Sequence, residues 1–340
     1  MPDFRDAIEA IRKELGTQLL ILGHHYQDGA VLQHADVIGD SLELARAAAA
    51  GKAERIVFCG VHFMAESADI LTTPAQSVYM PETSAGCPMA EMAGDLQVEK
   101  AWALLQERGK DWAPVVYVNS TARVKAFCGR HGGSACTSSN APKVFQWALG
   151  QRQRVFFLPD EHLGANTAHD LGIPEEHIAV FNYRQPNGGL TPAQLDKAAV
   201  VVWGGFCPIH VVFTVDQVQD IRARWPDAKI IVHPETPKEV VRLCDAHGST
   251  AQIIKYVESA PDGATIFVGT ESHLVRRLAE KHKDRLTVKV LHSSVCPNMA
   301  KTNGQNLLTV LRDWPHNRLV RVPASVAAEA RLCLERMLAL

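Results

Sequence analysis

The sequence is short of three features that each define a class of protein: long apolar runs, an excess of one charge, and closely spaced cysteine pairs. Its 340 residues carry 35 Lys and Arg against 37 Asp and Glu, a net charge of -2, so the chain offers no basic footprint for nucleic acid. No stretch approaches the roughly 18 consecutive apolar residues of a membrane-spanning helix. Residues 1–15 form a polar amphipathic pattern rather than the apolar segment of a signal peptide. We therefore expect a cytoplasmic protein without nucleic-acid or membrane partners.

The eight cysteines include no C-x-x-C pair. This weighs against a structural zinc site, which usually draws its ligands from two close pairs. Three cysteines precede a proline: Cys87, Cys207 and Cys296. Because proline fixes φ and lacks an N–H, each Cys-Pro pair marks a rigid turn where a strand or helix stops. Three distant turns of one kind suggest a shared metal site, although three unrelated turns would also explain the pairs at this point.

The segments that lead to these turns repeat along the chain. Apolar runs predict strands at residues 18–23, 55–60, 77–80, 114–118, 154–158, 198–203, 229–232, 264–268 and 286–291. Helices are predicted between them at residues 42–50, 64–70, 141–149 and 250–259. From His24 to Ser41, from Asn119 to Ser138 and from His233 to Thr250, the spacing between a polar strand end and a helix-starting hydroxyl is 17, 19 and 17 residues. Such regular spacing indicates repeated structural units.

Alternating strands and helices predict parallel sheets covered by helices, with ligands at the carboxyl ends of the strands. We predict an α/β fold of three similar αβα units, residues 1–88, 89–208 and 209–297, around a pseudo-threefold axis with the active site at the centre. Residues 298–340 are predicted to form C-terminal helices that pack outside this core. Each unit then supplies one cysteine of a Cys-Pro pair to a common site.

Three thiolates cannot close a tetrahedral zinc site. A [4Fe-4S] cluster on Cys87, Cys207 and Cys296 would leave one iron without a protein ligand. Such an iron can act as a Lewis acid on a hydroxyl or carboxylate, as expected of a dehydrating enzyme. The pattern therefore predicts one [4Fe-4S] cluster per chain.

The remaining cysteines are predicted to have other roles. Cys59, Cys244 and Cys333 lie in apolar settings and are expected to pack in the core. Cys128 and Cys136 flank a predicted glycine-rich loop. They could form a regulatory disulfide or help to cover the site, but ordinary loop variation is favoured because cytosolic thiols stay reduced.

Ten short motifs extend over nearly the whole chain: His24–Tyr26, Gly39–Leu42, Gly86–Ala90, Tyr117–Ser120, Cys136–Ala141, Leu158–Asn166, Cys207–His210, His233–Glu235, Gly248–Thr250 and Gly269–Glu271. Together they resemble the quinolinate synthase family, the iron–sulfur enzymes of de novo NAD synthesis. The resemblance implies a condensing synthase of the transferase or lyase type. It would join iminosuccinate (iminoaspartate) to dihydroxyacetone phosphate, releasing phosphate and two waters to give quinolinate. It also implies a supply of iminosuccinate from an L-aspartate oxidase or dehydrogenase.

Carried over by motif, the same resemblance implies that Cys87, Cys207 and Cys296 hold the cluster. It assigns substrate binding to His24, Ser41, Tyr117, Val118, Asn119, Ser138, His233, Pro234, Glu235, Ser249 and Thr250. Three of these hydroxyl residues are predicted at helix starts, where free N–H groups favour an anion, although ordinary capping would also place hydroxyls there. The candidates for proton transfer are Tyr26, His210, His233 and Glu235, since imine isomerisation, phosphate elimination and ring closure all move protons.

The third cysteine departs from the pattern of some family members, which carry a C-x-x-C-x-x-C run there. In residues 290–296 this chain has only Cys296, so no second redox pair accompanies it. Two other functions remain open at this point. One is another [4Fe-4S] hydro-lyase that acts on a hydroxy acid without a phosphorylated co-substrate. The other is a non-enzymatic sensor or scaffold, which would need a basic or apolar partner surface that the sequence does not indicate.

Overall fold

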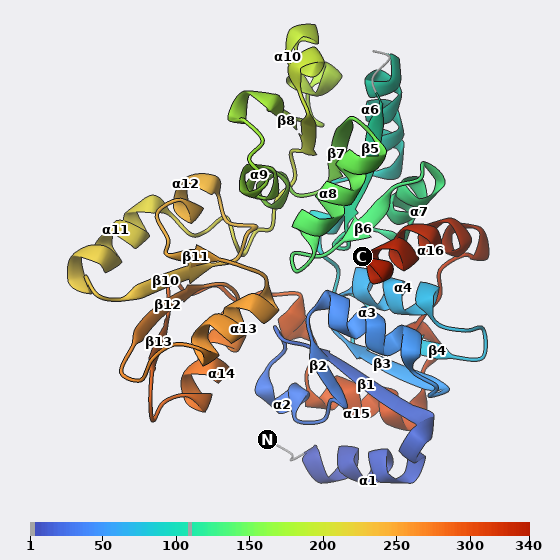
Figure 1. Ribbon diagram of the computed structural model, residues 1–340. Coiled ribbons are helices and arrows are strands. Elements are labelled where there is room, and N and C mark those ends of the chain that lie inside the picture. Colours follow the sequence, from blue (N-terminus) through green and yellow to red (C-terminus); the bar gives the residue numbers. More distant parts are fainter. Residues whose placement is uncertain (1–3, 108–110) are drawn as a thin grey trace.

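The computed structural model of the protein describes residues 4–107 and 111–340. Within them the strands form three separate sheets, which lie in three lobes around the middle of the molecule (Figure 1). The first sheet contains β1 (Leu19–His24), β2 (Val37–Gly39), β3 (Arg55–Cys59), β4 (Ser77–Tyr79) and β14 (Leu319–Val320). The second contains β5 (Trp112–Tyr117), β6 (Ser134–Cys136), β7 (Arg154–Leu158), β8 (Ile178–Phe181) and β9 (Val200–Trp203). The third contains β10 (Lys229–Val232), β11 (Ala246–His247), β12 (Thr265–Gly269) and β13 (Thr287–Val290).

The same strand order recurs in all three sheets. The orders are β2-β1-β3-β4, β6-β5-β7-β9 and β11-β10-β12-β13, with β14 and β8 added at one edge of the first and second sheets. All pairs within these orders are parallel, and only β14 runs antiparallel to its neighbour β4. The central strands are apolar between their ends because both faces of a parallel sheet are covered. In β5 and β9 every residue is buried.

The helices connect and cover the strands. They are α1 (Arg5–Leu15), α2 (Gly29–Leu32), α3 (Ser41–Ala50), α4 (His62–Leu71), α5 (Pro88–Glu91), α6 (Asp95–Glu107), α7 (Ala122–Arg130), α8 (Ala141–Gln151), α9 (Glu161–Asp170), α10 (Pro192–Lys197), α11 (Val215–Arg224), α12 (Lys238–Val241), α13 (Thr250–Glu258), α14 (Ser272–Lys281), α15 (Gly304–Asp313) and α16 (Ala324–Ala339). Among the described residues, no helix is long and apolar enough to cross a membrane.

The prediction of an α/β fold with parallel sheets is confirmed, and each predicted strand lies within two residues of an observed one. Five strands were not predicted: β2, β6, β8, β11 and β14. Three of them, β2, β6 and β11, are two or three residues long and end just before a hydroxyl motif. A strand this short has no detectable periodicity, but its place in each unit accounts for the regular spacing of the motifs.

The prediction of a glycine-rich loop from Cys128 to Cys136 is wrong. Cys128 belongs to α7, and Cys136 is the last residue of β6. Both are buried free thiols, and Cys128 Sγ donates to the carbonyl oxygens of Pro114 and Ser134. Glycine here serves close packing: a Cβ on Gly129 would collide with the backbone oxygen of Glu329 in α16.

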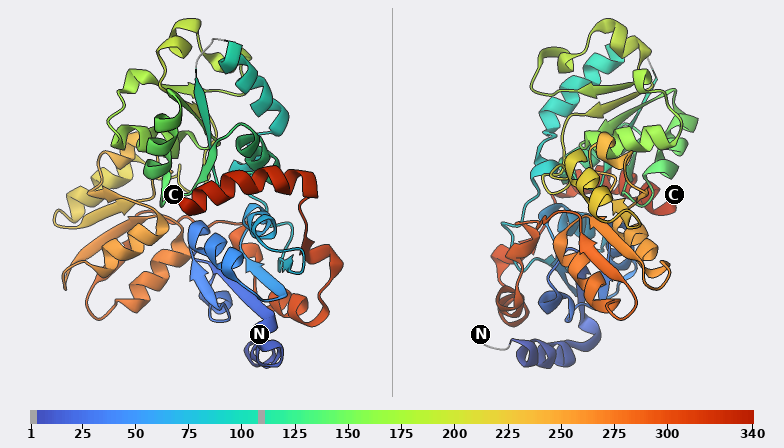
Figure 2. Two further views of the ribbon diagram at one scale, coloured as in Figure 1. Left: turned by 45° about the vertical axis from the view of Figure 1, so that its right-hand side comes forward. Right: turned by 90° about the vertical axis from the view of Figure 1, so that its left-hand side faces the viewer.

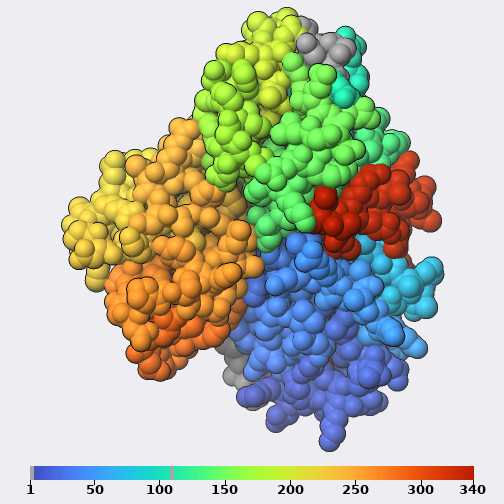
Figure 3. All heavy atoms as spheres, viewed as in Figure 1, coloured from blue at the N-terminus to red at the C-terminus, as the bar shows by residue number. Residues whose placement is uncertain are grey.

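The C-terminal segment packs against two of the lobes. Helix α15 lies on α1 and shares a small apolar core with it through Ile8, Leu307 and Leu311. Helix α16 lies against α7, α4 and β6, so it joins the second lobe to the first (Figures 1 and 2). In the space-filling view its outer side forms part of the surface between these two lobes (Figure 3).

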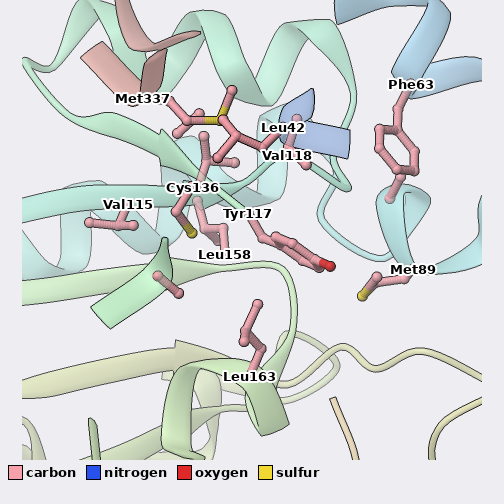
Figure 4. Packing of buried hydrophobic residues seen from close by; sticks show 14 of the residues in the cluster. Leu42, Phe63, Met89, Val115, Tyr117, Val118, Cys136, Leu158, Leu163 and Met337 are labelled. Carbon is pink, nitrogen blue, oxygen red and sulfur yellow. The ribbon is translucent and has the colours of Figure 1, made fainter. Parts of the chain in front are cut away.

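One apolar core lies behind the ends of the second sheet. Val115, Cys136, Leu158 and Met337 of α16 belong to this one buried cluster (Figure 4). Tyr117 also belongs to this cluster but carries a polar hydroxyl. Its ring leaves the packed side chains and its hydroxyl points toward the side where Met89 lies (Figure 4), which is the direction of the cavity described below.

The contact between α7 and α16 gives a test of the packing. Gly129→Ala would force the two helices apart, so we expect the free energy of unfolding to fall by roughly 1–3 kcal/mol, measured by urea unfolding. Gly150→Ala in α8 is the matched control, because a Cβ there meets nothing within 4 Å. The control should leave stability unchanged or raise it by roughly 0.5–1 kcal/mol. Equal stability of both variants would contradict the close contact of α7 and α16.

Candidate active site

The carboxyl ends of the three sheets open into one cavity. Its wall includes His24 at the end of β1, Tyr117 at the end of β5 and His233 just after β10. The volume of the cavity is about 110 Å³, whereas a single water needs roughly 10–15 Å³ on the same measure. The cavity can therefore hold a group much larger than water.

The three cysteines of the Cys-Pro pairs meet in this cavity. Each follows the last strand of the repeated order: Cys87 follows β4, Cys207 follows β9 and Cys296 follows β13. All three are free thiols of intermediate exposure. None of the other five cysteines lines the cavity. Of those five, four are buried, and Cys244 is partly buried with its Sγ donating to the carbonyl oxygen of Val240.

The three Cys-Pro turns share a local geometry. Backbone N–H groups two or three residues beyond the cysteine donate to each sulfur: those of Met89 and Ala90 to Cys87, of Ile209 to Cys207, and of Asn298 and Met299 to Cys296. Burial raises the pKa of all three thiols, that of Cys87 to about 12, and these N–H groups oppose the increase. Hydrogen bonds of this kind are typical of sulfur ligands in metal clusters.

A second possible set of metal ligands shares Cys207 with the three cysteines. Atoms of Cys207, His210 and Glu235 lie within 4.8 Å of one another. Two of these residues are, however, already paired with each other: His210 Nδ1 is 2.7 Å from Glu235 Oε2. Three convergent thiols are also a softer and more suitable donor set for iron–sulfur binding than one thiol, one imidazole and one carboxylate. The donor chemistry favours the three cysteines.

Glu235 is the centre of a hydrogen-bonded chain. Its Oε1 accepts a hydrogen bond of 2.5 Å from the hydroxyl of Tyr117, and its Oε2 pairs with His210 as above. Burial favours the neutral acid, but the neighbouring His233 and His210 and the hydrogen bonds from His210 and Tyr117 lower the pKa of Glu235 below its usual value. The side chain is therefore a buried carboxylate that is held at both oxygens.

The chain continues from His210 to Tyr26. His210 Nε2 is 3.2 Å from Thr270 Oγ1, which is 2.8 Å from the Tyr26 hydroxyl. Thr250 Oγ1 donates to the same hydroxyl at 3.4 Å. Burial and the charge of Glu235 raise the pKa values of Tyr26 and Tyr117 well above the usual value, so both tyrosines are neutral in the resting site. One network thus reaches residues from all three sheets.

His24 and His233 are locked in the same way. The N–H of the second following residue, Tyr26 or Glu235, donates to Nδ1 of the histidine. Burial lowers the pKa of each histidine to about 3. Each is therefore a neutral imidazole that carries its proton on Nε2. For His233 this atom lies 3.3 Å from Ser138 Oγ.

Two of the three predicted hydroxyls are the first residues of helices, Ser41 of α3 and Thr250 of α13, whereas Ser138 lies three residues before α8. The helix-capping residues are Asp40 for α3, Asn140 for α8 and Ser249 for α13, and only Asp40 and Ser249 accept a capping hydrogen bond through the side chain. Ser41, Ser138 and Thr250 are therefore not caps. All three line the cavity, where Thr250 Oγ1 contacts the Tyr26 hydroxyl and Ser138 Oγ contacts His233 Nε2.

The structure places the remaining predicted residues in two groups. Asn119 lines the cavity, and its buried Oδ1 has no hydrogen-bond partner among the described residues. Val118, Pro234 and Ser249 do not line the cavity. They instead support it: the Val118 N–H bonds to Cys136, the Pro234 carbonyl accepts from Asn166, and Ser249 caps α13.

Sequence reasoning missed three polar residues at or beside the cavity. Asp40 and Asn298 line it, and buried Thr270 links Tyr26 to His210 from behind. Asp40 and Thr270 stand in the quoted motifs Gly39–Leu42 and Gly269–Glu271, and Asn298 lies two residues after Cys296. A signal for all three was therefore present in the sequence, but their roles depend on contacts between distant segments.

These features define an α/β protein whose three sheets bring thiols, neutral imidazoles, hydroxyls and one buried carboxylate to a single cavity. A family profile described as "Quinolinate synthetase A protein" matches residues 6–339. Among curated proteins, "Quinolinate synthase" of Lysinibacillus sphaericus is 47% identical over 99% of this chain and 93% of its own length. That of Anoxybacillus flavithermus is 48% identical over 98% and 92%, and that of Bacillus subtilis 44% over 99% and 93%.

The chain belongs to the quinolinate synthase family, and it is an enzyme of that family. The predicted resemblance is confirmed. Among solved structures, a D-lactate dehydrogenase from Sporolactobacillus sp aligns over 95% of this chain and 98% of its own, but with 10% identity and a TM-score of 0.19, so it carries no argument.

The network behind the cavity can be tested through Thr270. Thr270→Val removes Oγ1 at nearly constant shape and leaves the buried Tyr26 hydroxyl and His210 Nε2 without their shared partner. We expect the free energy of unfolding to fall by roughly 1–3 kcal/mol, measured by urea or thermal unfolding. Thr287→Val, at an exposed position in β13, is the control and should change stability by less than about 0.5 kcal/mol. If the two variants unfold alike, Thr270 does not hold the network.

Proposed function

We propose that this protein is a quinolinate synthase that condenses iminosuccinate with dihydroxyacetone phosphate to quinolinate, releasing phosphate and two waters. Family membership over nearly the whole chain supports this proposal. The observation that carries it is the meeting of three Cys-Pro thiols and the Glu235 network in one cavity. The three thiols suit an iron–sulfur cluster, and the Glu235 network suits the proton transfers of a condensation.

We assign Cys87, Cys207 and Cys296 as the ligands of a [4Fe-4S] cluster. When bound there, such a cluster supplies one iron without a protein ligand, which can polarise a substrate hydroxyl or carboxylate as a Lewis acid. The fit rests on the chain's own residues: three free thiols that follow three different sheets and line one cavity, each receiving backbone N–H hydrogen bonds. Proline at the next position removes the N–H there and fixes the turn.

The substrate carboxylates bind to neutral donors in this proposal. His24 and His233 can each present an Nε2–H, because Nδ1 is occupied by a backbone N–H. Ser41, Ser138 and Thr250 add hydroxyls, and the starts of α3 and α13 add a favourable dipole for an anion. Tyr117 and Asn119 complete the binding wall.

Proton transfer is assigned to the chain of Tyr26, His210 and Glu235. The Glu235 carboxylate holds the proton of His210 on Nδ1, so Nε2 is the atom that can accept a proton from the cavity side. Tyr26, which shares Thr270 with that nitrogen, can pass a proton between His210 and the substrate. His233 stacks on His210 with ring centroids 4.4 Å apart and keeps the imidazole in place.

The same strand order in three sheets supports the proposed division into units 1–88, 89–208 and 209–297 around a pseudo-threefold axis. In this arrangement each unit supplies one cysteine and one wall of polar residues. We place the reaction in the cytoplasm, supplied with iminosuccinate by an L-aspartate oxidase or dehydrogenase. Iminosuccinate hydrolyses in water, so its source and this cavity must act in the same compartment.

The reaction is tested by a product assay. Anaerobically purified protein with dihydroxyacetone phosphate, oxaloacetate and ammonia should form quinolinate, detected by liquid chromatography. Omission of dihydroxyacetone phosphate should abolish the product, because three of the ring carbons come from it. Turnover of a hydroxy acid without the phosphorylated substrate would instead indicate a hydro-lyase.

The cluster ligands are tested by three separate changes. Cys87→Ser, Cys207→Ser and Cys296→Ser should each lose most of the roughly four irons per chain expected of a [4Fe-4S] protein, together with the quinolinate activity. Cys244→Ser is the control, because Cys244 is also partly buried but lies outside the cavity. Iron analysis and absorption spectra measure the outcome. Full iron in any of the three variants would remove that residue from the ligand set.

A further inference from the structure

One buried charged residue near the cavity has no part in the chemistry described above. Lys125 lies in α7 with a fully buried side chain. Its Nζ donates to the carbonyl oxygen of Ser120 at 2.6 Å and lies 5.3 Å from the centroid of the Phe63 ring. Among the described residues it forms no ion pair with a carboxylate.

Both contacts of Lys125 lead to the cavity. Phe63 is part of the cavity wall, as is Cys87. Ser120 directly follows Asn119, whose side chain also lines the cavity. The ammonium group therefore lies behind the wall that carries one cysteine and one substrate-binding residue.

No carboxylate is paired with the buried ammonium group of Lys125 among the described residues. A buried ammonium without a paired anion is costly. Burial lowers the pKa of Lys125 to about 8, while the negative charge of the nearby Glu66 carboxylate acts in the opposite direction. Glu66 is already engaged at the start of α7, where its Oε2 accepts the Ala122 N–H at 3.1 Å. The full anionic charge near Lys125 arises only when the cavity holds thiolates and a dicarboxylate.

We propose that Lys125 is a positioning residue whose buried positive charge balances the anions of the cavity on the Cys87 side. Its hydrogen bond to Ser120 fixes the turn that carries Asn119. The Phe63 ring separates the ammonium group from the cavity, and the positive charge attracts the Cys87 thiolate and the substrate across this ring. This inference rests on the proposed function, since that function supplies the anions. It gives a role in the reaction to a residue that does not touch the cavity.

Three substitutions separate charge from hydrogen bonding. Lys125→Arg keeps the charge, Lys125→Gln keeps a donor for Ser120 without the charge, and Lys125→Met removes both. Lys143→Met is the control, because it removes the same charge from an exposed position in α8. Two quantities are measured: the midpoint potential of the cluster, and the affinity of the cluster-free protein for quinolinate by calorimetry.

We expect Lys125→Gln and Lys125→Met to make the cluster harder to reduce, because a nearby positive charge favours the added electron. A tenfold change in the ratio of oxidised to reduced cluster corresponds to about 59 mV for a one-electron couple, and we expect a decrease of about this size. Quinolinate should bind about tenfold more weakly to the same two variants. Lys125→Arg and Lys143→Met should resemble the wild type in both measurements.

Wild-type values of potential and affinity in Lys125→Gln would overturn the inference, because only the hydrogen bond to Ser120 would then matter. Loss of folding in all three Lys125 variants would also overturn it, since Lys125 would then be needed for the core alone. A wild-type protein without a cluster and without quinolinate formation would contradict the proposed function instead. The two failures are therefore distinguishable.

Discussion

The buried carboxylate of Glu235 is the interaction on which the site depends. A charge in a fully buried position must be paired, because its desolvation is not otherwise compensated. Tyr117 of the second sheet and His210, which follows Cys207, each hold one oxygen. Through Thr270 the same network reaches Tyr26 beyond the first sheet. Three sheets that share no strand pairing are thus joined by hydrogen bonds at their carboxyl ends.

Much of this arrangement could be predicted from the sequence. Buried parallel strands are apolar on both faces, so β5, β7 and β9 are visible as uninterrupted apolar runs. The sequence could not reveal the strands β2, β6 and β11, because two or three residues carry no pattern. The sequence also left the exact capping residue open, since Ser138 and Asn140 are equally plausible caps until the start of α8 is seen. The role of Thr270 was hidden because it comes from contacts with Tyr26 and His210, far away in the chain.

The cysteines show how position separates similar residues. Cys136 ends a strand as Cys59 does, and both thiols are fully buried with pKa values raised by burial alone. Cys87, Cys207 and Cys296 lie on turns beyond the strand ends, where their sulfurs receive backbone N–H groups and reach the cavity. Each of these cysteines comes several residues after its strand has ended, and the proline that follows fixes φ and lacks an N–H, so the N–H groups of the next turn are the ones that reach the sulfur.

The three sheets share a strand order but differ in the polar group that follows their strands. The first and third sheets lead to His24 and His233, both held by the N–H two residues later and both carrying a proton on Nε2. The second supplies Asn119, whose Oδ1 is a buried acceptor without a partner. Two imidazole donors and one amide acceptor are compatible with the proposed substrate, iminosuccinate, which carries two carboxylates and one N–H. Different polar groups at equivalent strand ends allow one cavity to distinguish the carboxylates of such a ligand from its N–H.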